Sequence, residues 1–384
     1  MNRRQFIILL VVVAAVGAAG WIVHQRNSNS WQGSETGIGR KLLPELAIND
    51  ITQITIQSGT NVLMLVRWGN WRVADRGLYP ANFSQISELL LKLAALKIVQ
   101  SEQIGPSQLG RFELLPPGSE KNSGTQVQLS NQKGKVLATL LLGKKHMTKR
   151  AGNSQPGGLG GDGWPDGRYV IVGTAPQNVD LISDPLESLQ PHPAPWLNRD
   201  FFSIENPRTI EARFADTTNS WKLIRASETN DWQLADTKAG EALDLSKISG
   251  VTRLFSSVNF NDVSPLKSDS ATNATVLTVE TFDGFTYVAN ISPQQDDIYP
   301  VNFSINASLP AERAATPDEK PDDKIKLDQA FKEQHDRLAK KLAGEKQFEN
   351  WVYFLPSYSL DEMLKQRGQL LTETNAATAT EPTK

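Results

Sequence analysis

Cysteine is absent from this chain of 384 residues. Its absence excludes disulfide bonds, thiolate nucleophiles, zinc–thiolate sites and lipid attachment through an N-terminal cysteine. Histidine is scarce as well, with four residues scattered along the chain. A zincin helix needs two histidines one turn apart with a glutamate between them, and His335 stands alone on its predicted helix. The sequence therefore predicts neither a metal site nor any other cofactor.

Neither sign of charge dominates, because 40 lysines and arginines face 42 aspartates and glutamates, for a formal net charge of −2. A protein that binds nucleic acid is expected to show a basic face or stripe, and the sequence contains none. Nucleic acid is therefore excluded as a partner. Hydrophobic residues make up 39% of the chain, with nine tryptophans and fourteen phenylalanines. This is enough apolar surface for folded cores, and the length suits two or three domains.

Charged side chains are also missing from one long run near the N-terminus. From Phe6 to Val23 every residue is apolar or glycine, and about 18 helical residues span roughly 27 Å, enough for a thin hydrocarbon core. Backbone groups in lipid must be satisfied internally, so we expect this run to be a helix. We predict a membrane anchor over residues 1–26, with membrane lipid as its partner. The anchoring residues singled out are Phe6, Leu9, Val12, Trp21 and Val23.

The charges that flank this run predict its direction. Arg3 and Arg4 precede it, so by the positive-inside rule the N-terminus stays cytoplasmic. We expect a single-pass membrane protein in which everything after Arg26 is exported. Two alternatives remain: Val16, Gly17 and Ala18 could form a signal-peptide cleavage site, and "RRQFI" resembles a twin-arginine export motif. The length of the apolar run favours an uncleaved anchor.

Three segments predict connections rather than cores. Residues 27–44 begin as a polar stretch rich in glycine and serine, which is typical of a flexible tether. Residues 372–384 form a low-complexity tail that we expect to be disordered. The proline-rich stretch "PHPAPWLNRDFF" predicts an extended hinge between two domains. Within it, Arg199 and Asp200 are expected to fix the angle between those domains or to be solvated.

An internal repeat accounts for most of the remaining chain. When Trp71 is aligned with Trp232, "WRVAD" faces "WQLAD", "NFSQIS" faces "DLSKIS", and "LVR" faces "LIR". Self-similarity of this kind indicates a duplicated structural unit. We predict a first α+β unit over residues 45–200 and a second over residues 201–371, each of ordinary domain size.

Local patterns predict the structure of each unit. "ITQITIQ" with "VLMLVR", and "TIEARFA" with "SWKLIR", alternate as the strands of hairpins do. A tryptophan strand follows in each copy, and then Asn82 or Asp244 as the N-cap of a helix with an apolar stripe. Such a sheet can bury one face against such a helix, which predicts an α+β fold. The expected core residues of the repeat are Trp71, Trp232, Ile86 and Ile248.

The rest of each unit is expected to add three strands and a helix. Hairpins are predicted around Lys133-Gly134 and Asp283-Gly284, the second with a type I′ turn. "GRYVIVG" and "NWVYFLP" are expected to be equivalent strands, leading to helices over residues 178–189 and 360–366. An amphipathic helix over residues 325–342 is predicted as an insertion in the second unit. The predicted fold is an N-terminal transmembrane helix followed by two tandem repeats of antiparallel sheet packed with helices.

No cluster of residues predicts catalysis. The glycine-rich loop before Arg168 lacks the Gly-Lys-Ser/Thr ending of a phosphate-binding loop, and Asp162 and Asp166 match no calcium loop. No nucleophile-elbow motif is present. Hydrogen bonds at strand ends explain the recurring Asp75 and Asp236 better than a carboxylate pair does. The repeated tryptophans are expected in the core rather than as sugar-stacking platforms. We predict no catalytic, cofactor-binding or metal-binding residue, and no enzymatic activity.

Three stretches carry a resemblance to a known family. "LLPELAINDITQITIQ", "LMLVRWGNWRVADRGLYPANFSQISELLLKLAALKIVQSEQ" and "WLNRDFFSIE", behind a single anchor helix, resemble the domain-of-unknown-function 4340 family. The resemblance covers about residues 40–205 and is weaker over the second unit. Members are bacterial membrane-anchored proteins, often linked with gliding-motility-type and other ABC-2 transporter auxiliary components. The resemblance implies an ABC transporter permease or auxiliary subunit as partner, and it implies no catalytic residue.

These observations together predict a non-enzymatic, membrane-anchored periplasmic accessory or binding subunit of an ABC-type transport system. One alternative is a stand-alone cell-envelope binding or scaffolding module, for example for polysaccharide, which would require exposed tryptophans. A second alternative is a hydrolase with an unrecognised site, which would require polar residues clustered in a cleft.

Overall fold

The computed structural model of the chain describes residues 38–118, 121–148, 163–173, 178–253, 259–266, 274–314 and 319–372. The chain divides into two compact units, residues 1–198 and 199–384. Within the described ranges, no helix combines the length and the apolar character needed to cross a membrane. The predicted anchor over residues 1–26, including Arg3 and Arg4, and the tail beyond residue 372 lie outside those ranges.

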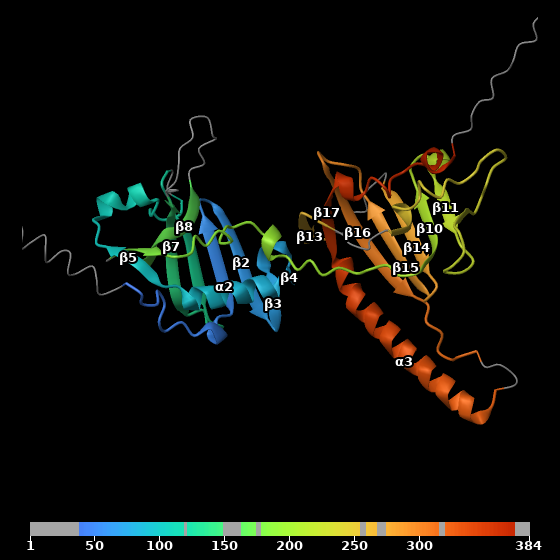
Figure 1. Cartoon of the computed structure of the whole chain (residues 1–384), viewed down its shortest axis with the longest axis horizontal. Helices are drawn as coiled ribbons and strands as arrows, with labels where there is room; N and C mark the ends of the chain where they lie inside the picture. The colour runs from blue at the N-terminus through green and yellow to red at the C-terminus, as the bar shows by residue number, and fades with distance from the viewer. Residues whose placement is uncertain are drawn as a thin grey trace, which may run out of the picture. The chain divides into compact units, whose positions relative to one another are not determined.

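Most of the described chain is β-sheet, in two antiparallel sheets with few helices (Figure 1). The sheet of the first unit has the order β4-β3-β2-β1-β6-β7-β8-β9-β5. Its strands are β1 (Gln53–Ser58), β2 (Asn61–Trp68), β3 (Asn70–Val73), β4 (Tyr79–Pro80), β5 (Ile98–Glu102), β6 (Thr125–Ser130), β7 (Val136–Thr148), β8 (Trp164–Val172) and β9 (Val179–Ile182). The helix α2 (Phe83–Ala95) covers one face of this sheet.

The sheet of the second unit has the order β12-β11-β10-β14-β15-β16-β17-β13. Its strands are β10 (Pro207–Arg213), β11 (Trp221–Ile224), β12 (Gln233–Leu234), β13 (Asp262–Pro265), β14 (Thr275–Thr281), β15 (Phe285–Ile291), β16 (Ile298–Ala307) and β17 (Trp351–Pro356). The helix α3 (Pro321–Glu345) lies between β16 and β17 in the sequence. Short 3₁₀ helices are η1 (Ile48–Asp50), η2 (Ala74–Arg76), η3 (Pro106–Phe112), η4 (Ala194–Trp196), η5 (Thr217–Asn219), η6 (Val251–Arg253), η7 (Lys346–Asn350), η8 (Ser357–Ser359) and η9 (Arg367–Leu370).

The hairpin of β1 and β2 forms as its alternating sequence predicts. Ile54 pairs with Leu65 and Ile56 pairs with Leu63, and all four side chains are at most 1% exposed. Because successive side chains of a strand alternate between faces, these four residues share the buried face. They form the centre of the first core.

Helix α2 also begins where the sequence predicts. The side chain of Asn82 accepts a hydrogen bond of 3.2 Å from the backbone N–H of Gln85, which satisfies one of the amides left over at a helix start. The residues that α2 buries recur at helical spacing, and they are Ile86, Leu89, Leu90 and Leu93.

The two sheets follow the same strand order when their strands are matched by position. The order β3-β2-β1-β6-β7-β8-β9-β5 corresponds to β12-β11-β10-β14-β15-β16-β17-β13, and only β4 lacks a counterpart. The predicted equivalence of β8 and β17 is therefore wrong, because β17 occupies the place of β9 and β16 that of β8. The insertion of α3 between two neighbouring strands hides this relation in the sequence.

Two predicted helices are not formed. Residues 178–189 contain β9, whose pairing with β5 and β8 places Val179 and Ile182 in the core. Residues 360–366 contain one helical turn, in which Leu364 donates its backbone N–H to Leu360, between η8 and η9. A single turn is too short to propagate as an α-helix, because nucleation costs more than one hydrogen bond returns.

The second copy of the capped helix differs from the first. Asp244 accepts a 3.0 Å hydrogen bond from the backbone N–H of Ser246, but a series of turns and η6 follow instead of an α-helix up to residue 253. Gly250 stands where α2 has Glu88, and glycine inside a helix costs about 1 kcal/mol relative to alanine. Residues 254–258 of the predicted helix lie outside the described ranges.

The core of the second unit is rich in aromatic rings. We name as the aromatic cluster the residues Phe201, Phe202, Phe260, Phe285, Tyr287, Phe303, Phe348 and Tyr353, whose neighbouring ring centroids lie 4.3 to 6.1 Å apart. The cluster joins Phe201 and Phe202, the last two residues of the predicted hinge stretch, to β15, β16, β17 and η7. Aromatic pairs at this spacing add to the free energy of simple burial.

Candidate binding site at the inserted helix

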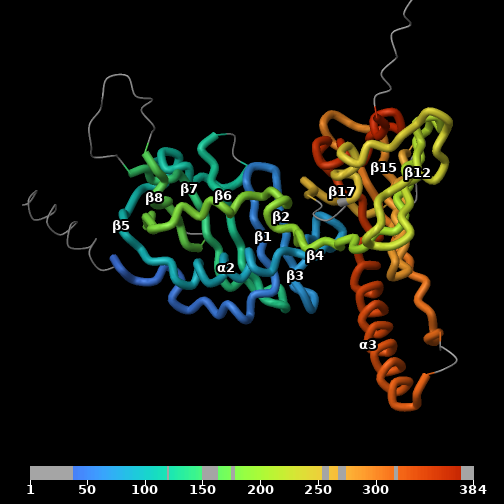
Figure 2. Tube along the Cα trace, turned by 45° about the vertical axis from the view of Figure 1, so that its right-hand side comes forward, coloured from blue at the N-terminus to red at the C-terminus, as the bar shows by residue number. Residues whose placement is uncertain are grey.

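Helix α3 is the largest difference between the two units. Proline at its first position and Asp322 and Asp323 in its first turn favour a helix start there, through a preset φ and the helix dipole. Residues 321–330 are all exposed, including Ile325 at 67% and Leu327 at 45%. Two views show these first turns extending beyond the strands of the second sheet, whereas the C-terminal end of the helix meets them (Figures 1 and 2). The predicted helix over residues 325–342 is thus confirmed, and it is longer at both ends.

A buried carboxyl group fixes the C-terminal end of α3. Glu345 is 7% exposed, and the hydroxyl of Tyr287 donates a 2.8 Å hydrogen bond to its Oε2. The ammonium of Lys341 lies 3.9 Å from Glu345 Oε1, 3.6 Å from Glu205 Oε2 and 5.3 Å from the centre of the Phe285 ring. Burial raises the pKa of Glu345, and burial together with the hydrogen bond to Glu345 raises the pKa of Tyr287.

The raised pKa of Glu345 gives the second unit a testable pH dependence. The folded chain holds this proton more tightly than the unfolded chain, whose carboxyl has a pKa near 4.5. The stability that the neutral carboxyl contributes is therefore complete below pH 4.5 and is lost as pH rises through the folded-state pKa.

We expect Glu345→Gln to keep the acceptor for Tyr287 and to lose less stability between pH 4.5 and 8 than the wild type. Urea unfolding at several pH values measures this, with the exposed Glu333→Gln as the control. Parallel curves for wild type and Glu345→Gln would contradict the assignment.

The segment that follows β16, residues 308–314, lies beside α3 and is joined to it by an ion pair. We name these residues the strap. The guanidinium of Arg313 binds Glu319 through two hydrogen bonds and Asp328 of α3 at 3.0 Å. These hydrogen bonds raise the pKa of Arg313, so its positive charge is present throughout the accessible pH range. The segment that follows β16 is thereby joined to the helix.

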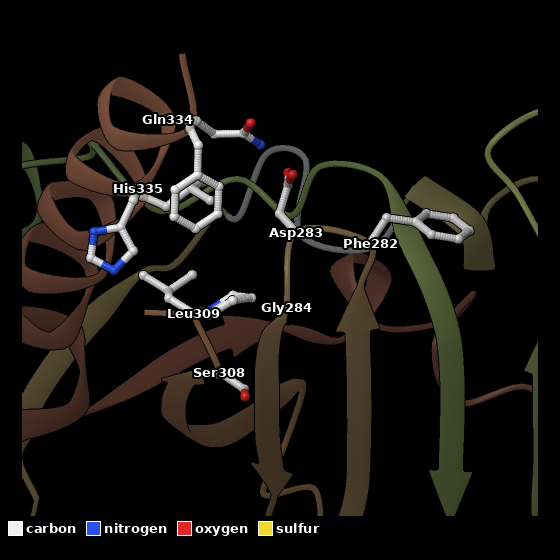
Figure 3. Close-up of a pocket in the computed structure, with 10 residues that line it drawn as sticks. Phe282, Asp283, Gly284, Ser308, Leu309, Gln334 and His335 are labelled. Atoms are coloured by element: carbon white, nitrogen blue, oxygen red, sulfur yellow. The ribbon is translucent and has the colours of Figure 1, made fainter. Parts of the chain in front are cut away.

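A cavity of about 280 Å³ lies between α3, this strap and the turn that joins β14 to β15. Its lining residues are Phe282, Asp283, Gly284, Ser308, Leu309, Pro310, Phe331, Gln334, His335 and Leu338. In Figure 3, Gln334 extends its carboxamide toward the turn that carries Asp283, and His335 occupies the next position on the helix. Carboxylate, carboxamide and imidazole groups therefore surround an otherwise apolar space.

The turn below the cavity depends on Gly284. Its φ is +84°, and a Cβ atom there would lie 2.6 Å from the carbonyl oxygen of Ser308. Asp283 is not among the residues with positive φ, although a type I′ turn requires positive φ at both central positions. The predicted hairpin is therefore confirmed but its predicted turn type is wrong. The glycine lets β15 and the strap approach closely, which forms the floor of the cavity.

The cavity combines a solvated imidazole–carboxylate pair with apolar walls. His335 Nδ1 lies 3.8 Å from Asp336, and both side chains are more than one-third exposed, so the pair is solvated. Within the described ranges, no group of three histidine, aspartate or glutamate side chains could hold a metal ion. The cavity offers an acceptor in Asp283 and apolar walls in Phe331 and Leu338. A partner side chain with an apolar stem and a polar or basic end fits that composition.

The recurring aspartates have different partners in the two units. Asp75 accepts a 2.9 Å hydrogen bond from the backbone N–H of Met64, which confirms the predicted bond near a strand end. Asp236 instead binds the side chain of Arg367 at 3.0 Å. A carboxylate pair between Asp75 and Asp236 is not possible within one unit, because they belong to different ones.

The repeat residues singled out from the sequence lie mostly in the cores. Trp71 is 5% exposed, Ile86 0% and Ile248 2%. Trp232 is half-buried, with the guanidinium of Arg225 4.8 Å from its ring centre. The singled-out anchor residues lie outside the described ranges.

The hinge residue Arg199 binds within the second unit. It donates a hydrogen bond to the carbonyl oxygen of Phe260, and its guanidinium lies 4.5 Å from the centre of that ring. This contact lies inside one unit, and the expected role of Arg199 in fixing the angle between the domains stays a prediction.

One polar pair was not predicted from the sequence. His146 Nδ1 lies 2.6 Å from Asp166 Oδ1, and this hydrogen bond is the main cause of the lowered pKa of Asp166. The pair spans β7 and β8, whose register places His146 opposite Gly167. Only that register brings the two residues together, and no spacing rule reveals it. Both side chains are at least 40% exposed, and Asp162 lies outside the described ranges.

Comparison with known proteins gave no matching family model, no matching curated protein and no matching solved structure.

Proposed function

We propose that this chain is a non-enzymatic, membrane-anchored periplasmic accessory subunit of an ABC-type transport system, and that α3 presents its partner-binding surface. In this proposal residues 1–26 anchor two duplicated antiparallel units, and the partner is a permease or auxiliary subunit. The single observation that carries the binding role is the exposed first half of α3, with Ile325 and Leu327 in solvent. Support for the transporter class comes from the resemblance to the domain-of-unknown-function 4340 family.

Exposed apolar residues on an inserted helix are available to a partner, and Ile325 and Leu327, two positions apart, lie on different sides of α3. Ile325 and Leu327 contribute little to the fold at their exposed fractions, and the corresponding connection of the first unit, between Val172 and Val179, is six residues long. Helix surfaces of this kind typically dock through a few apolar anchors, which account for most of the binding energy. The cavity beside Phe331 then accepts a second anchor from the partner.

The test uses the tagged full-length chain, extracted from the membranes of its own host in mild detergent. We expect transporter permease or ATPase subunits to co-purify, and Ile325→Glu with Leu327→Glu to reduce their recovery at least about tenfold, the equivalent of 1.4 kcal/mol. The matched control is Lys324→Glu with Lys326→Glu, which changes neighbouring exposed residues of the same helix. The control should retain its partners.

Two outcomes would refute the proposal. One is recovery of transporter subunits that is equal for both pairs of substitutions, which would exclude α3 as the docking surface. The other is recovery of no transporter subunit together with unchanged export in a deletion strain, which would exclude the transport role.

A further inference from the structure

The outer face of α2 carries a line of side chains that the first core does not use, with an apolar residue at each end and a serine between them. Phe83, Ser87 and Leu91 follow one another at intervals of four residues, so they lie on one side of the helix. Phe83 is 67% exposed and Leu91 57%. From Phe83 to Leu91 the line extends about 12 Å along the helix.

A cavity of about 180 Å³ runs beside this line. One wall consists of α2, and the other includes Ile48, Asn49 and Ile51 from the segment before β1. Arg67 and Trp71, which are paired across β2 and β3, complete the lining. We name this space, together with Phe83 and Leu91, the α2 groove. Arg67 is the one formally charged residue among those that line it.

The matching arginine of the second unit shows what Arg67 lacks. Arg67 donates its backbone N–H to Thr52, and Arg225 makes the corresponding bond to Arg208, so the two occupy equivalent places. The guanidinium of Arg225 donates to two backbone carbonyl oxygens and stacks on Trp232. The Arg67 side chain, by contrast, makes no hydrogen bond or ion pair with any residue that the structure describes.

We propose that the α2 groove docks an amphipathic helix of a partner protein, and that an aspartate or glutamate of that helix pairs with Arg67. The exposed arginine supplies the charge complementarity, and its position beside Trp71 places it at the edge of an apolar floor. Phe83 and Leu91, about two turns apart on one side of α2, would contact the apolar face of a second helix laid along the groove, with the small Ser87 between them. The site lies in the first unit and stands independently of the role given to α3.

The experiment screens the full-length chain, reconstituted in lipid nanodiscs, against a displayed library of amphipathic helical peptides about four turns long. We expect the wild type to enrich peptides with an apolar face and a carboxylate at one position. Arg67→Glu should reverse that preference to lysine or arginine at the same position, and should weaken the best acidic peptide at least about tenfold. Phe83→Asp should abolish binding of both kinds of peptide.

Lys133→Glu is the matched control, because it makes the same change in charge at an exposed turn of the same unit. It should leave the acidic preference unchanged. Absence of enrichment, or an identical charge preference in wild type and Arg67→Glu, would overturn the proposal. Concentration-dependent dimers in sedimentation that disappear in Phe83→Asp would assign the groove to a second copy of the chain, and would overturn it as well. Unchanged circular dichroism of Arg67→Glu, whose exposed side chain has no described partner, verifies that the fold is retained.

Discussion

Replacing Phe202 by alanine is expected to lower the free energy of unfolding of the second unit by about 4 kcal/mol. Phe202 is 4% exposed and its ring centroid lies 5.4 Å from Tyr287, 5.1 Å from Phe303 and 5.8 Å from Phe348. Removing the ring forfeits its burial and leaves a cavity that the surrounding strands can fill only in part. A loss of this size is a large share of the stability of an ordinary domain.

Hydrogen exchange followed by mass spectrometry measures this effect unit by unit, because it reports local opening free energies. Amides of β15, β16 and β17 should lose protection in Phe202→Ala, while those of β1, β2 and β6 keep it. Tyr358→Ala is the control, since that ring is 68% exposed and should cost little. Equal loss of protection in the first sheet would show that the two units unfold together, and would contradict the expectation.

Replacing Arg367 by alanine is expected to destabilise the second unit by about 2 kcal/mol, because it removes the charge-assisted hydrogen bonds of a buried guanidinium whose carboxylate partners are more exposed. Its side chain is 5% exposed, donates to both carboxylate oxygens of Asp236 and contacts Glu241 at 2.6 Å. A further hydrogen bond, from Nη2, reaches the backbone carbonyl of Asp236. These bonds join the segment after β17 to the segment after β12, so the variant should expose both to exchange. Arg337→Ala on the exposed side of α3 is the control.

The same network makes a prediction about acid. The hydrogen bond from Arg367 lowers the pKa of Glu241 to about 2. A lowered folded-state pKa means that the stabilisation is present above the unfolded value near 4.5 and is lost as pH falls toward 2. Arg367→Ala should therefore lose less stability than the wild type over that interval. Urea midpoints measured from pH 5 to pH 2 decide the matter, and an unchanged slope would exclude the ion pair as the cause.

Local patterns in the sequence predict the elements that depend on near neighbours. Alternation predicts the hairpins of β1 with β2 and of β14 with β15, and Asn82 predicts the start of α2. The strand β9 could not be found in this way, because it is short and depends on pairing with β5, which lies far away in the sequence. A short apolar run is equally compatible with a helix, and only the tertiary partner decides between them.

Of the candidate site, only the helix α3 could be predicted from the sequence. Periodic apolar residues predict α3, but not which of its residues face solvent. The cavity beside it arises where Gly284, Leu309 and Phe331 meet from three separate elements. The α2 groove could not be predicted either, because "LVR" and "LIR" are alike in sequence. The side chain of Arg225 has partners within its own unit, whereas the side chain of Arg67 has none among the described residues. The sequence shows that two positions are alike, and packing decides how each is used.

The position of α3 between two paired strands shows which part of the unit can vary in length. In the first unit, residues 173–178 suffice to join β8 to β9, which are adjacent strands of the sheet. In the second unit, residues 308–350 make the corresponding join between β16 and β17, whose pairing persists. The connection between these two strands therefore differs in length and sequence between the units, while the strands on either side of it stay paired. Exchanging the helix alone would change the exposed surface of the second unit and leave the pairing of β16 with β17 in place.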